Sequence, residues 1–465
     1  MNLSAVPPSR NRDGALGLLE ARFAARFSRG AEIRRQHANT VNWLGNQPPD
    51  AVVFVESTEE VAEVVSLCAA ARIPVIPFGT GTALEGHVNA PLGGVSIDLS
   101  RMNRILAVRP EDLDCTVEAG VTRLQLNTHL RDQGLFFPID PGADASLGGM
   151  AATRASGTNA VRYGTMRDSV VNLTVVMADG TIIKTAGRAR KSSAGYDLTR
   201  LFVGSEGTLG IITELTLRLC GIPETIAAGV CAFPDVESAC DATILTIQSG
   251  IPVARIELLD TLMISGTNAY AGLGLPESPH LFVEFHGSPA AVAEQTAAFG
   301  AIAADFGGTG FRSATGPEER TRLWQARHEA YFIAKSMRPG AEVVATDACV
   351  PISRLADCVR ETIADIEAGG FIAPIVGHVG DGNFHVQIML DRDNPAEVAA
   401  AEGFLKRLAE RAIRMEGTCT GEHGVGQGKR RYMEIEHGRA LAPMRAVKAA
   451  LDPFGIMNPG KVLPE

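Results

Sequence analysis

The chain has 465 residues, which is too long for one ordinary hydrophobic core and predicts two or three domains. Apolar residues make up 45% and charged residues 21%, a composition typical of globular proteins and not of disordered ones. The formal net charge of -10 argues against a protein whose main surface binds nucleic acid, so we expect no nucleic-acid partner.

The eight cysteines are scattered, and no Cys-x-x-Cys pair occurs. This spacing excludes the usual iron-sulfur and zinc-knuckle patterns and favours reduced thiols. No apolar run reaches the ~18 residues that a membrane-spanning helix needs, and residues 1–20 lack the apolar core of a signal peptide. We therefore expect a cytoplasmic chain without a transmembrane segment, in peripheral contact with a membrane at most. Whether its start is a targeting segment stays open.

Strand and helix signals alternate in the first part of the chain. Residues 51–57, 58–72 and 73–79 read as strand, helix and strand, and Ser57 with Glu60 makes a capping box at the helix start. The apolar face of this helix follows the i, i+3, i+4, i+7 spacing at Val61, Val64, Val65 and Cys68.

The middle of the chain changes pattern. Asp179-Gly180 lies between two segments rich in β-branched residues and predicts a hairpin turn. Leu215, Leu217 and Leu219 alternate with polar residues, which is typical of a half-buried strand. Glycine and proline at 221–223 break the pattern. Beyond them, two strand-helix units predict an antiparallel sheet backed by helices, which is an α+β domain.

Three glycine-rich stretches are candidates for holding a ligand. In residues 77–87 (PFGTGTALEGH), successive backbone N–H groups could bind a phosphate, although Leu84 replaces the third glycine of a G-x-G-x-x-G motif and a plain tight turn is an equal alternative. Residues 140–164 and 203–212 carry many small residues, which suits a backbone passing close to a flat ligand or to another backbone. Residues 455–462 only imitate a P-loop, because Val462 replaces its Ser/Thr.

Two of the ten histidines stand seven residues apart around Gly380-Asp381-Gly382. On one continuous strand His378 and His385 would face opposite sides, but a turn between them would form a hairpin and bring both imidazoles together. Two imidazoles suit a divalent metal, and Glu422 and His423 on a glycine-rich loop could complete the site. Ordinary hydrogen-bonding histidines are an equal alternative.

Six motifs in the same order indicate a family. Together they resemble the FAD-linked D-lactate dehydrogenase (cytochrome type) family, within the vanillyl-alcohol-oxidase-like flavoproteins, to which glycolate oxidase and D-2-hydroxyglutarate dehydrogenase are related. The resemblance implies an α+β fold with a two-part FAD-binding domain of the PCMH type and a substrate or cap domain with an antiparallel sheet. The motifs occupy residues 77–87, 140–168, 190–217, 377–386, 417–430 and 451–463.

The resemblance also implies a domain organisation. We expect an N-terminal helical extension at 1–40, an FAD-binding domain at 41–222, a substrate or cap domain with the metal site at 223–440, and a C-terminal segment at 441–465 that returns to the FAD domain. FAD should be noncovalent, because the first loop has no histidine before His87.

The residues that the resemblance assigns to FAD fall into four groups along its length. They are Gly79, Thr80, Gly81 and Thr82 at the pyrophosphate; Pro141, Gly142, Gly148, Gly149, Ser156 and Gly157 along the rest of the path; Glu206, Gly207 and Ile211 near the adenine and ribose; and Asn458 from the terminal motif.

For the second domain, the resemblance implies His378, His385 and Glu422 as ligands of Zn, Mn or Fe, with His423 as general base. The choice of metal stays open. An imidazole titrates near neutral pH and can take the substrate's hydroxyl proton.

Arg327 is the candidate that grips the substrate carboxylate, since a guanidinium can do so bidentately. A surface salt bridge is the alternative for this arginine. We expect Trp324, His328 and Tyr331 on the same helix face as Arg327. Thr346 stands where hydroxyglutarate-type relatives have a lysine, which favours a small monocarboxylate substrate.

The implied reaction is oxidation of a D-2-hydroxy acid, first of all D-lactate to pyruvate, by hydride transfer to flavin N5. Electrons would then pass to a cytochrome, a quinone or an electron-transfer flavoprotein. The alternatives are the FAD subunit of a glycolate oxidase complex, a non-redox flavoenzyme resembling alkylglycerone-phosphate synthase, and a flavin-binding protein without turnover. Whether the chain is a homodimer stays open.

Overall fold

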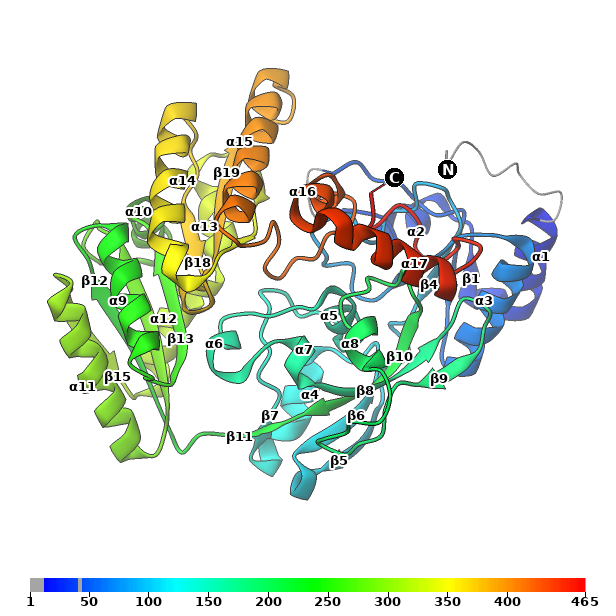
Figure 1. Ribbon diagram of the computed structural model, residues 1–465, viewed down its shortest axis with the longest axis horizontal. Helices are drawn as coiled ribbons and strands as arrows, with labels where there is room; N and C mark the ends of the chain where they lie inside the picture. Colours follow the sequence, from blue (N-terminus) through cyan, green and yellow to red (C-terminus); the bar gives the residue numbers. More distant parts are fainter. Residues whose placement is uncertain (1–11, 41–43, 465) are drawn as a thin grey trace. The chain divides into compact units, whose positions relative to one another are not determined.

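The computed structural model describes residues 12–40 and 44–464, drawn in Figure 1. The described chain forms two compact units. Unit 1 contains the residues up to Ser156, Thr165–Ile222 and the residues from Glu422 onward, and unit 2 contains Gly157–Gly164 and Pro223–Gly421.

Unit 1 has a mixed four-stranded sheet near its N-terminal end. The strand order is β1-β2-β4-β3, in which β2 and β3 run parallel to β4, and β1 is antiparallel to β2. The predicted helix is confirmed as α3, whose N-cap Ser57 accepts a hydrogen bond from the Glu60 N–H. The elements of this part are α1 (Arg12–Phe23), η1 (Ala24–Arg26), β1 (Phe27–Ser28), α2 (Ala31–Gln36), β2 (Ala51–Phe54), α3 (Thr58–Ala71), β3 (Val75–Phe78) and β4 (Val95–Asp98).

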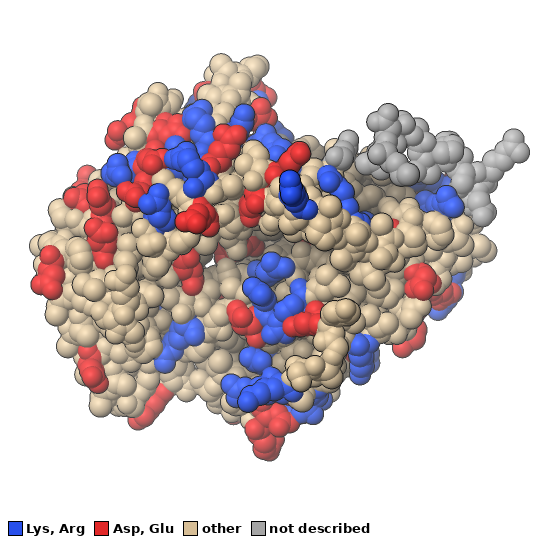
Figure 2. Space-filling model, viewed as in Figure 1, with Lys and Arg blue, Asp and Glu red and all other residues tan. Residues whose placement is uncertain are grey.

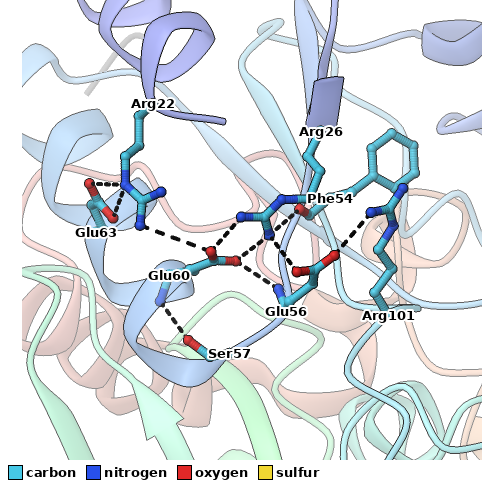
Figure 3. A network of polar contacts seen from close by, with 8 residues as sticks. All are labelled: Arg22, Arg26, Phe54, Glu56, Ser57, Glu60, Glu63 and Arg101. Atoms are coloured by element: carbon cyan, nitrogen blue, oxygen red, sulfur yellow. Dashed lines mark hydrogen bonds and ion pairs between the residues drawn. The ribbon is translucent and has the colours of Figure 1, made fainter. Parts of the chain in front are cut away.

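The N-terminal segment is tied to α3 by charge as well as by apolar packing. The guanidinium of Arg26 donates two 2.6 Å hydrogen bonds to the Glu60 carboxylate, and Arg22 from α1 pairs with Glu63 at 3.0 Å (Figure 3). Leu16 and Leu19 of α1 are buried in the same core cluster as the apolar face of α3. The segment therefore belongs to unit 1 by its packing, and it contributes the strand β1 besides helices.

The second sheet of unit 1 is antiparallel, in the order β5-β6-β10-β8-β9. The hairpin predicted at Asp179-Gly180 is confirmed, since β8 pairs with β9 and Gly180 has a φ of +85°. The predicted strand is confirmed as β10, but it is buried on both faces rather than on one, since Thr213 and Thr216 are buried as well as Leu215 and Leu217. The elements are β5 (Ile105–Arg109), η2 (Pro110–Asp112), β6 (Asp114–Glu118), α4 (Arg123–Leu130), η3 (Arg131–Gln133), β7 (Leu135–Phe136), α5 (Leu147–Thr153), α7 (Met166–Ser169), β8 (Val170–Val176), β9 (Ile182–Lys184), α8 (Leu198–Phe202), β10 (Ile211–Arg218) and β11 (Cys220–Gly221).

The C-terminal segment returns to the first sheet of unit 1. Asn458 donates its N–H to the carbonyl of Val75 at 2.9 Å, and the buried Lys461 donates to the carbonyl of Asn89 at 2.7 Å. This return begins at Glu422, whereas we expected it at residue 441. The elements after Glu422 are η6 (Arg430–Tyr432), α16 (Met433–His437), η7 (Gly438–Ala440) and α17 (Leu441–Leu451).

Unit 2 is built on the predicted antiparallel sheet. The eight-stranded sheet has the order β15-β12-β14-β13-β18-β19-β16, and its remaining strand, β17, also pairs with β19. The strands are β12 (Thr225–Ala232), β13 (Val253–Leu259), β14 (His280–Gly287), β15 (Thr309–Ala314), β16 (Glu342–Ala345), β17 (Ala348–Cys349), β18 (Ile375–Gly377) and β19 (Asn383–Leu390).

Helices cover both faces of this sheet. On one face Phe285 of β14 contacts Phe299 of α11, and on the other Phe282 lies in one cluster with Trp324 and Ile333 of α12 and α13. The helical elements are α6 (Ala160–Tyr163), α9 (Val236–Gln248), α10 (Thr261–Ala271), α11 (Pro289–Asp305), α12 (Pro317–His328), α13 (Ala330–Met337), η4 (Ile352–Arg354), α14 (Leu355–Gly369), η5 (Val379–Asp381) and α15 (Pro395–Arg414).

Ion pairs join α14 to α15, which run side by side (Figure 1). Arg407 and Arg411 both pair with Asp365, at 2.7 and 2.8 Å. Figure 2 shows acidic and basic side chains interspersed over these helices rather than separated by sign. No helix in the described part of the chain has the length and apolar character needed to cross a membrane, and the cysteines there form no disulfide.

Residues 157–164 leave unit 1 and pack on unit 2, a feature that we did not predict. The Tyr163 hydroxyl lies 2.7 Å from His286 Nδ1, and Arg255 Nε donates to the side chain of Asn159 at 2.9 Å. The chain therefore crosses between the units on both sides of this short segment as well as after Ile222 and after Gly421.

The buried Lys461 predicts a pH dependence of stability in unit 1. Burial lowers the pKa of this lysine from 10.5 to about 7. Between these two values the unfolded chain binds more protons than the folded one, so this group's contribution to stability rises with pH from about 7 towards 10.5. Replacing Lys461 by Met removes the buried charge and also the hydrogen bond to Asn89.

We expect the stability of Lys461→Met relative to the parent chain to fall by about 2–3 kcal/mol between pH 6 and pH 9. Urea unfolding followed by flavin fluorescence at both pH values would measure this change. Lys184→Met, at an exposed position of β9, is the control. If the difference in free energy of unfolding between Lys461→Met and the parent chain did not change with pH, the buried lysine charge would not be the cause of the pH dependence.

Candidate active site

The loop at residues 79–82 follows β3 and offers main-chain donors to a ligand. Gly81 has a φ of +70°, and the Oγ1 atoms of Thr80 and Thr82 lie 3.3 Å apart. Among the described residues, no backbone N–H of 79–82 donates to another backbone carbonyl. Consecutive N–H groups in a turn containing left-handed glycine form an anion-binding concavity. The loop therefore fits a pyrophosphate such as that of FAD.

The two adjacent glycines of α5, Gly148 and Gly149, differ in the space around them. Gly148 is buried, and a Cβ there would lie 2.6 Å from the Ala119 Cβ and 2.9 Å from its carbonyl oxygen. Gly149 is exposed, and a Cβ there would meet only the Ser146 Oγ, at 3.0 Å. The packing of the protein itself thus requires glycine at 148 but not at 149.

Glu206 anchors the loop that follows Glu422 and His423. Its buried carboxylate accepts hydrogen bonds from the N–H groups of Val425 and Gly426, at 2.7 and 2.8 Å, and lies 3.1 Å from His87 Nε2. Burial alone would raise the pKa of Glu206, but the His87 charge and these hydrogen bonds hold that pKa below its usual value. The carboxylate therefore serves the chain's own loop.

The other residues expected at FAD differ in their surroundings. Asn458 Nδ2 donates to the carbonyls of Glu206 and His87, and Gly207 packs so closely on Pro77 that a Cβ would lie 2.4 Å from its ring. Ser156 donates its hydroxyl to the Glu422 carboxylate at 2.8 Å. Ile211 is buried at the start of β10, Pro141 and Gly142 lie in the chain before α5, and Gly157 begins the segment that packs on unit 2.

The predicted histidine hairpin is present in unit 2. Strands β18 and β19 are joined through η5, and Val376 is paired with His385. The rings of His378 and His385 have centroids 5.3 Å apart and are nearly perpendicular, at 82°. Convergence of the two imidazoles is therefore confirmed, and the metal remains a proposal.

Hydrogen bonds determine the tautomers of both histidines. His378 Nδ1 lies 2.7 Å from Oε1 of Glu257, and His385 Nδ1 lies 2.8 Å from the carbonyl oxygen of Thr346. A carboxylate and a carbonyl only accept hydrogen bonds, so both Nδ1 atoms carry the proton. In a neutral ring the lone pair is then on Nε2, the arrangement typical of metal-binding histidines. The donor set thus fits a divalent metal.

Arg327 is buried and lies beside the histidine pair instead of forming a surface salt bridge. It is 7% exposed, and its Nε and Nη2 lie 2.8 and 2.6 Å from Oε2 of Glu257. One expectation about its surroundings was wrong. Tyr331 does not share its helix, because α12 ends at His328 and Tyr331 lies in α13. Trp324 and His328 do lie on α12, with ring centroids 6.5 Å apart.

Glu257 is a site residue that we did not predict. It is fully buried in the middle of β13, and its carboxylate contacts both His378 and Arg327. Burial raises its pKa, but the electrostatic interactions and hydrogen bonds with His378 and Arg327 outweigh burial and hold the pKa below its ordinary value. A carboxylate inside the apolar strand sequence VARIELL was the available signal.

Asp347 organises the chain just before Glu422. Its carboxylate accepts hydrogen bonds from Asn383 Nδ2 and Thr420 Oγ1, both at 2.8 Å, and lies 4.0 Å from His385 Nδ1. Gly421 packs against Asn383 so closely that a Cβ would lie 2.3 Å from its amide nitrogen. Thus the chain in unit 2 passes beside the histidine hairpin up to Gly421, and Glu422 is the next residue.

Two family models match the chain. The one described as FAD binding domain matches residues 49–186, and the one described as FAD linked oxidases, C-terminal domain matches residues 222–462. The chain belongs to the FAD-linked oxidase family that includes the D-lactate dehydrogenases. It is an FAD-dependent oxidoreductase of that family.

The similar proteins agree with this assignment. The chain is 54% identical to the probable mitochondrial D-lactate dehydrogenase of Danio rerio, over 93% of this chain and 88% of that protein. It is 49% identical to the mitochondrial D-lactate dehydrogenase [cytochrome] of Arabidopsis thaliana, over 90% of this chain and 74% of that one. The solved 4-ethylphenol oxidase from Gulosibacter chungangensis has the same fold, with a TM-score of 0.80, 17% identity and 98% coverage of each chain.

The glycine pair in α5 gives a test that separates protein packing from cofactor binding. We expect Gly148→Ala to destabilise the FAD-free protein by about 1–3 kcal/mol, because the new methyl group overlaps Ala119. Gly149→Ala should leave the FAD-free protein unchanged and weaken FAD binding several-fold. Unfolding of the FAD-free variants and FAD titration would measure both effects, and normal FAD affinity of Gly149→Ala would remove Gly149 from the cofactor path.

Proposed function

We propose that the chain is an FAD- and metal-dependent D-2-hydroxyacid dehydrogenase that oxidises D-lactate to pyruvate. The observation that carries the proposal is the pair His378 and His385, whose Nδ1 protons are held by protein acceptors in the same unit as the buried Arg327. The names of the similar proteins from Danio rerio and Arabidopsis thaliana support D-lactate as the substrate.

His378, His385 and Glu422 would hold the metal, which is Zn, Mn or Fe. Two imidazoles and one carboxylate suit these ions. The bound ion would act as a Lewis acid that polarises the substrate hydroxyl and as a template for its carboxylate. Support for Glu422 comes from Gly421, which lies against Asn383 in unit 2.

Arg327 would bind the substrate carboxylate. Glu257 takes the edge of the guanidinium formed by Nε and Nη2, so the edge that includes Nη1 faces away from Glu257 and could pair with a carboxylate. Thr346 offers no positive charge for a second carboxylate, which favours a monocarboxylate. A buried cation of this kind selects acids over neutral alcohols.

FAD would lie along the loop at 79–82 in unit 1 and would accept the C2 hydride of the substrate at N5. His423 would take the proton of the substrate hydroxyl, so that lactate loses a hydride and a proton and becomes pyruvate. Electrons would leave to a cytochrome. The word cytochrome in the name of the Arabidopsis thaliana protein supports this choice of acceptor. A quinone or an electron-transfer flavoprotein would fit the same chemistry.

Anaerobic reduction of the bound flavin tests the proposed function. We expect D-lactate to bleach the visible flavin band of the metal-loaded protein quickly, while L-lactate, glycolate and D-2-hydroxyglutarate do so slowly or not at all. The spectrum before and after each addition measures this directly. Bleaching by glycolate alone would favour a glycolate oxidase subunit, and bleaching by none of the acids would contradict the proposal.

Replacing His385 by Ala tests the metal's part in this reaction. We expect the variant to fold and to keep FAD, but to lose bound metal and at least a hundredfold in the rate of flavin reduction, because a ligand is missing. Metal content by elemental analysis and the flavin spectrum separate these effects. His280→Ala, at a buried histidine of β14, is the control for loss of a buried ring. Full activity of His385→Ala would exclude this metal site.

A further inference from the structure

We propose that Glu257 is a positioning residue that orients the metal-binding ring of His378 and the substrate-binding guanidinium of Arg327 together. The inference rests on the proposed function and extends it to a residue that lies behind the site. Glu257 contacts neither metal nor substrate in this scheme. It acts through the two side chains that do.

Each oxygen of the Glu257 carboxylate has a different partner. Oε1 accepts a hydrogen bond from His378 Nδ1 at 2.7 Å, and Oε2 lies 2.8 and 2.6 Å from Nε and Nη2 of Arg327. The carboxylate is fully buried, so water does not replace these contacts. Moving either partner therefore breaks a charge-assisted hydrogen bond inside the protein.

The sheet register places Glu257 between these partners. Strands β13 and β18 pair with Leu258 opposite Gly377, so Glu257 and His378 are the next residues along the two antiparallel strands. Glu257 also pairs with Phe282 of β14, whose ring lies in the same cluster as Trp324 of α12. Arg327 stands one turn after Trp324 on that helix. Strand pairing and helix packing thus converge on one carboxylate.

The carboxylate constrains both partners at once. Its Oε1 keeps the His378 proton on Nδ1 and leaves the Nε2 lone pair for a metal. Its Oε2 holds one edge of the Arg327 guanidinium, which sets the direction of the other edge. A substrate that binds a metal through its hydroxyl and Arg327 through its carboxylate needs both directions to agree.

A glutamine at this position could not serve both partners. Its carbonyl oxygen can accept a hydrogen bond from His378 or from Arg327, but its NH₂ group would face the donor of the other. Glu257→Asp keeps the charge but shortens the side chain by one methylene, so it should not reach both partners. The two variants separate loss of charge from loss of reach.

Unit 2 offers a matched control in Glu284. This buried carboxylate also joins a histidine and an arginine, with Oε1 2.8 Å from His286 Nε2 and 3.6 Å from Arg255 Nε. Here Nε2 must carry the proton, and Nδ1 lies 2.7 Å from the Tyr163 hydroxyl, so both ring nitrogens of His286 have protein partners. Glu284→Gln therefore removes a similar buried charge without touching a candidate metal ligand.

The experiment measures Mn²⁺ and Zn²⁺ binding to FAD-loaded protein after chelator treatment, together with the kinetics of D-lactate oxidation. For Glu257→Gln we expect a 10- to 100-fold weaker metal affinity and a KM for D-lactate raised several-fold even at saturating metal. The metal affinity and the KM of Glu257→Asp should lie between those of Glu257→Gln and those of the parent chain. Glu284→Gln should bind both metals within twofold of the parent chain.

The outcomes distinguish this inference from the proposed function. If the parent chain binds metal and is reduced by D-lactate while Glu257→Gln matches it in metal affinity and KM, the positioning role is overturned and the proposed function stands. If the parent chain binds neither of these metals nor Fe²⁺, both are overturned. If Glu257→Gln does not retain FAD, Glu257→Asp decides, and unchanged metal affinity in that variant overturns the positioning role. If Glu284→Gln weakened metal affinity as much as Glu257→Gln, the positioning role of Glu257 would also be overturned.

Discussion

The register between β18 and β19 is the constraint on which the candidate site of unit 2 depends. Side chains alternate between the faces of a strand, so a slip of one residue would turn His385 to the opposite face, away from His378. Close backbone contacts oppose such a slip. A Cβ on Gly382 would lie 2.1 Å from the carbonyl oxygen of Val350, and one on Gly377 would lie 2.6 Å from the Phe384 Cβ. The tight turn thus sets the distance between the two rings.

Each unit contains a fully or almost fully buried carboxylate next to the candidate site residues, and fixed partners offset its desolvation cost. Glu206 accepts hydrogen bonds from two main-chain N–H groups of the loop after His423, whereas Glu257 accepts hydrogen bonds from two side chains. Main-chain partners fix the path of a loop, and side-chain partners fix the direction of functional groups. Removing one partner of a buried charge costs more than the net stability that the pair provides. Both carboxylates are therefore better explained by positioning than by stability.

What could be predicted from the sequence follows from the range of the interactions involved. The helix after Ser57, the turn at Asp179-Gly180 and the pairing of His378 with His385 depend on neighbours in the chain, and the structure confirms them. The role of Glu257 depends on His378, which is 121 residues away in the sequence. The two residues become neighbours only because β13 pairs with β18. No local pattern reports that pairing.

Long-range packing also explains the other differences. Residues 157–164 contain no signal for leaving unit 1, and their place follows from Tyr163 and Asn159 bonding to strands much later in the chain. The error at Tyr331 has a more local cause. A helix was extended across Glu329, where the structure ends α12 and starts α13. Periodicity identified the helical residues but not the interruption between them.

Glu422 and His423 are held by attachments of the chain on both sides of them. On one side Thr420 donates its hydroxyl to Asp347 within unit 2, and on the other Val425 donates its N–H to Glu206 within unit 1. Gly421 and Gly424 flank the two functional residues, and each packs too closely for a Cβ, against Asn383 and against the Glu206 carboxylate. Short polar anchors and glycines thus shape the loop that carries Glu422 and His423. The G-E-H-G motif is therefore explained by backbone placement as much as by the chemistry of its glutamate and histidine.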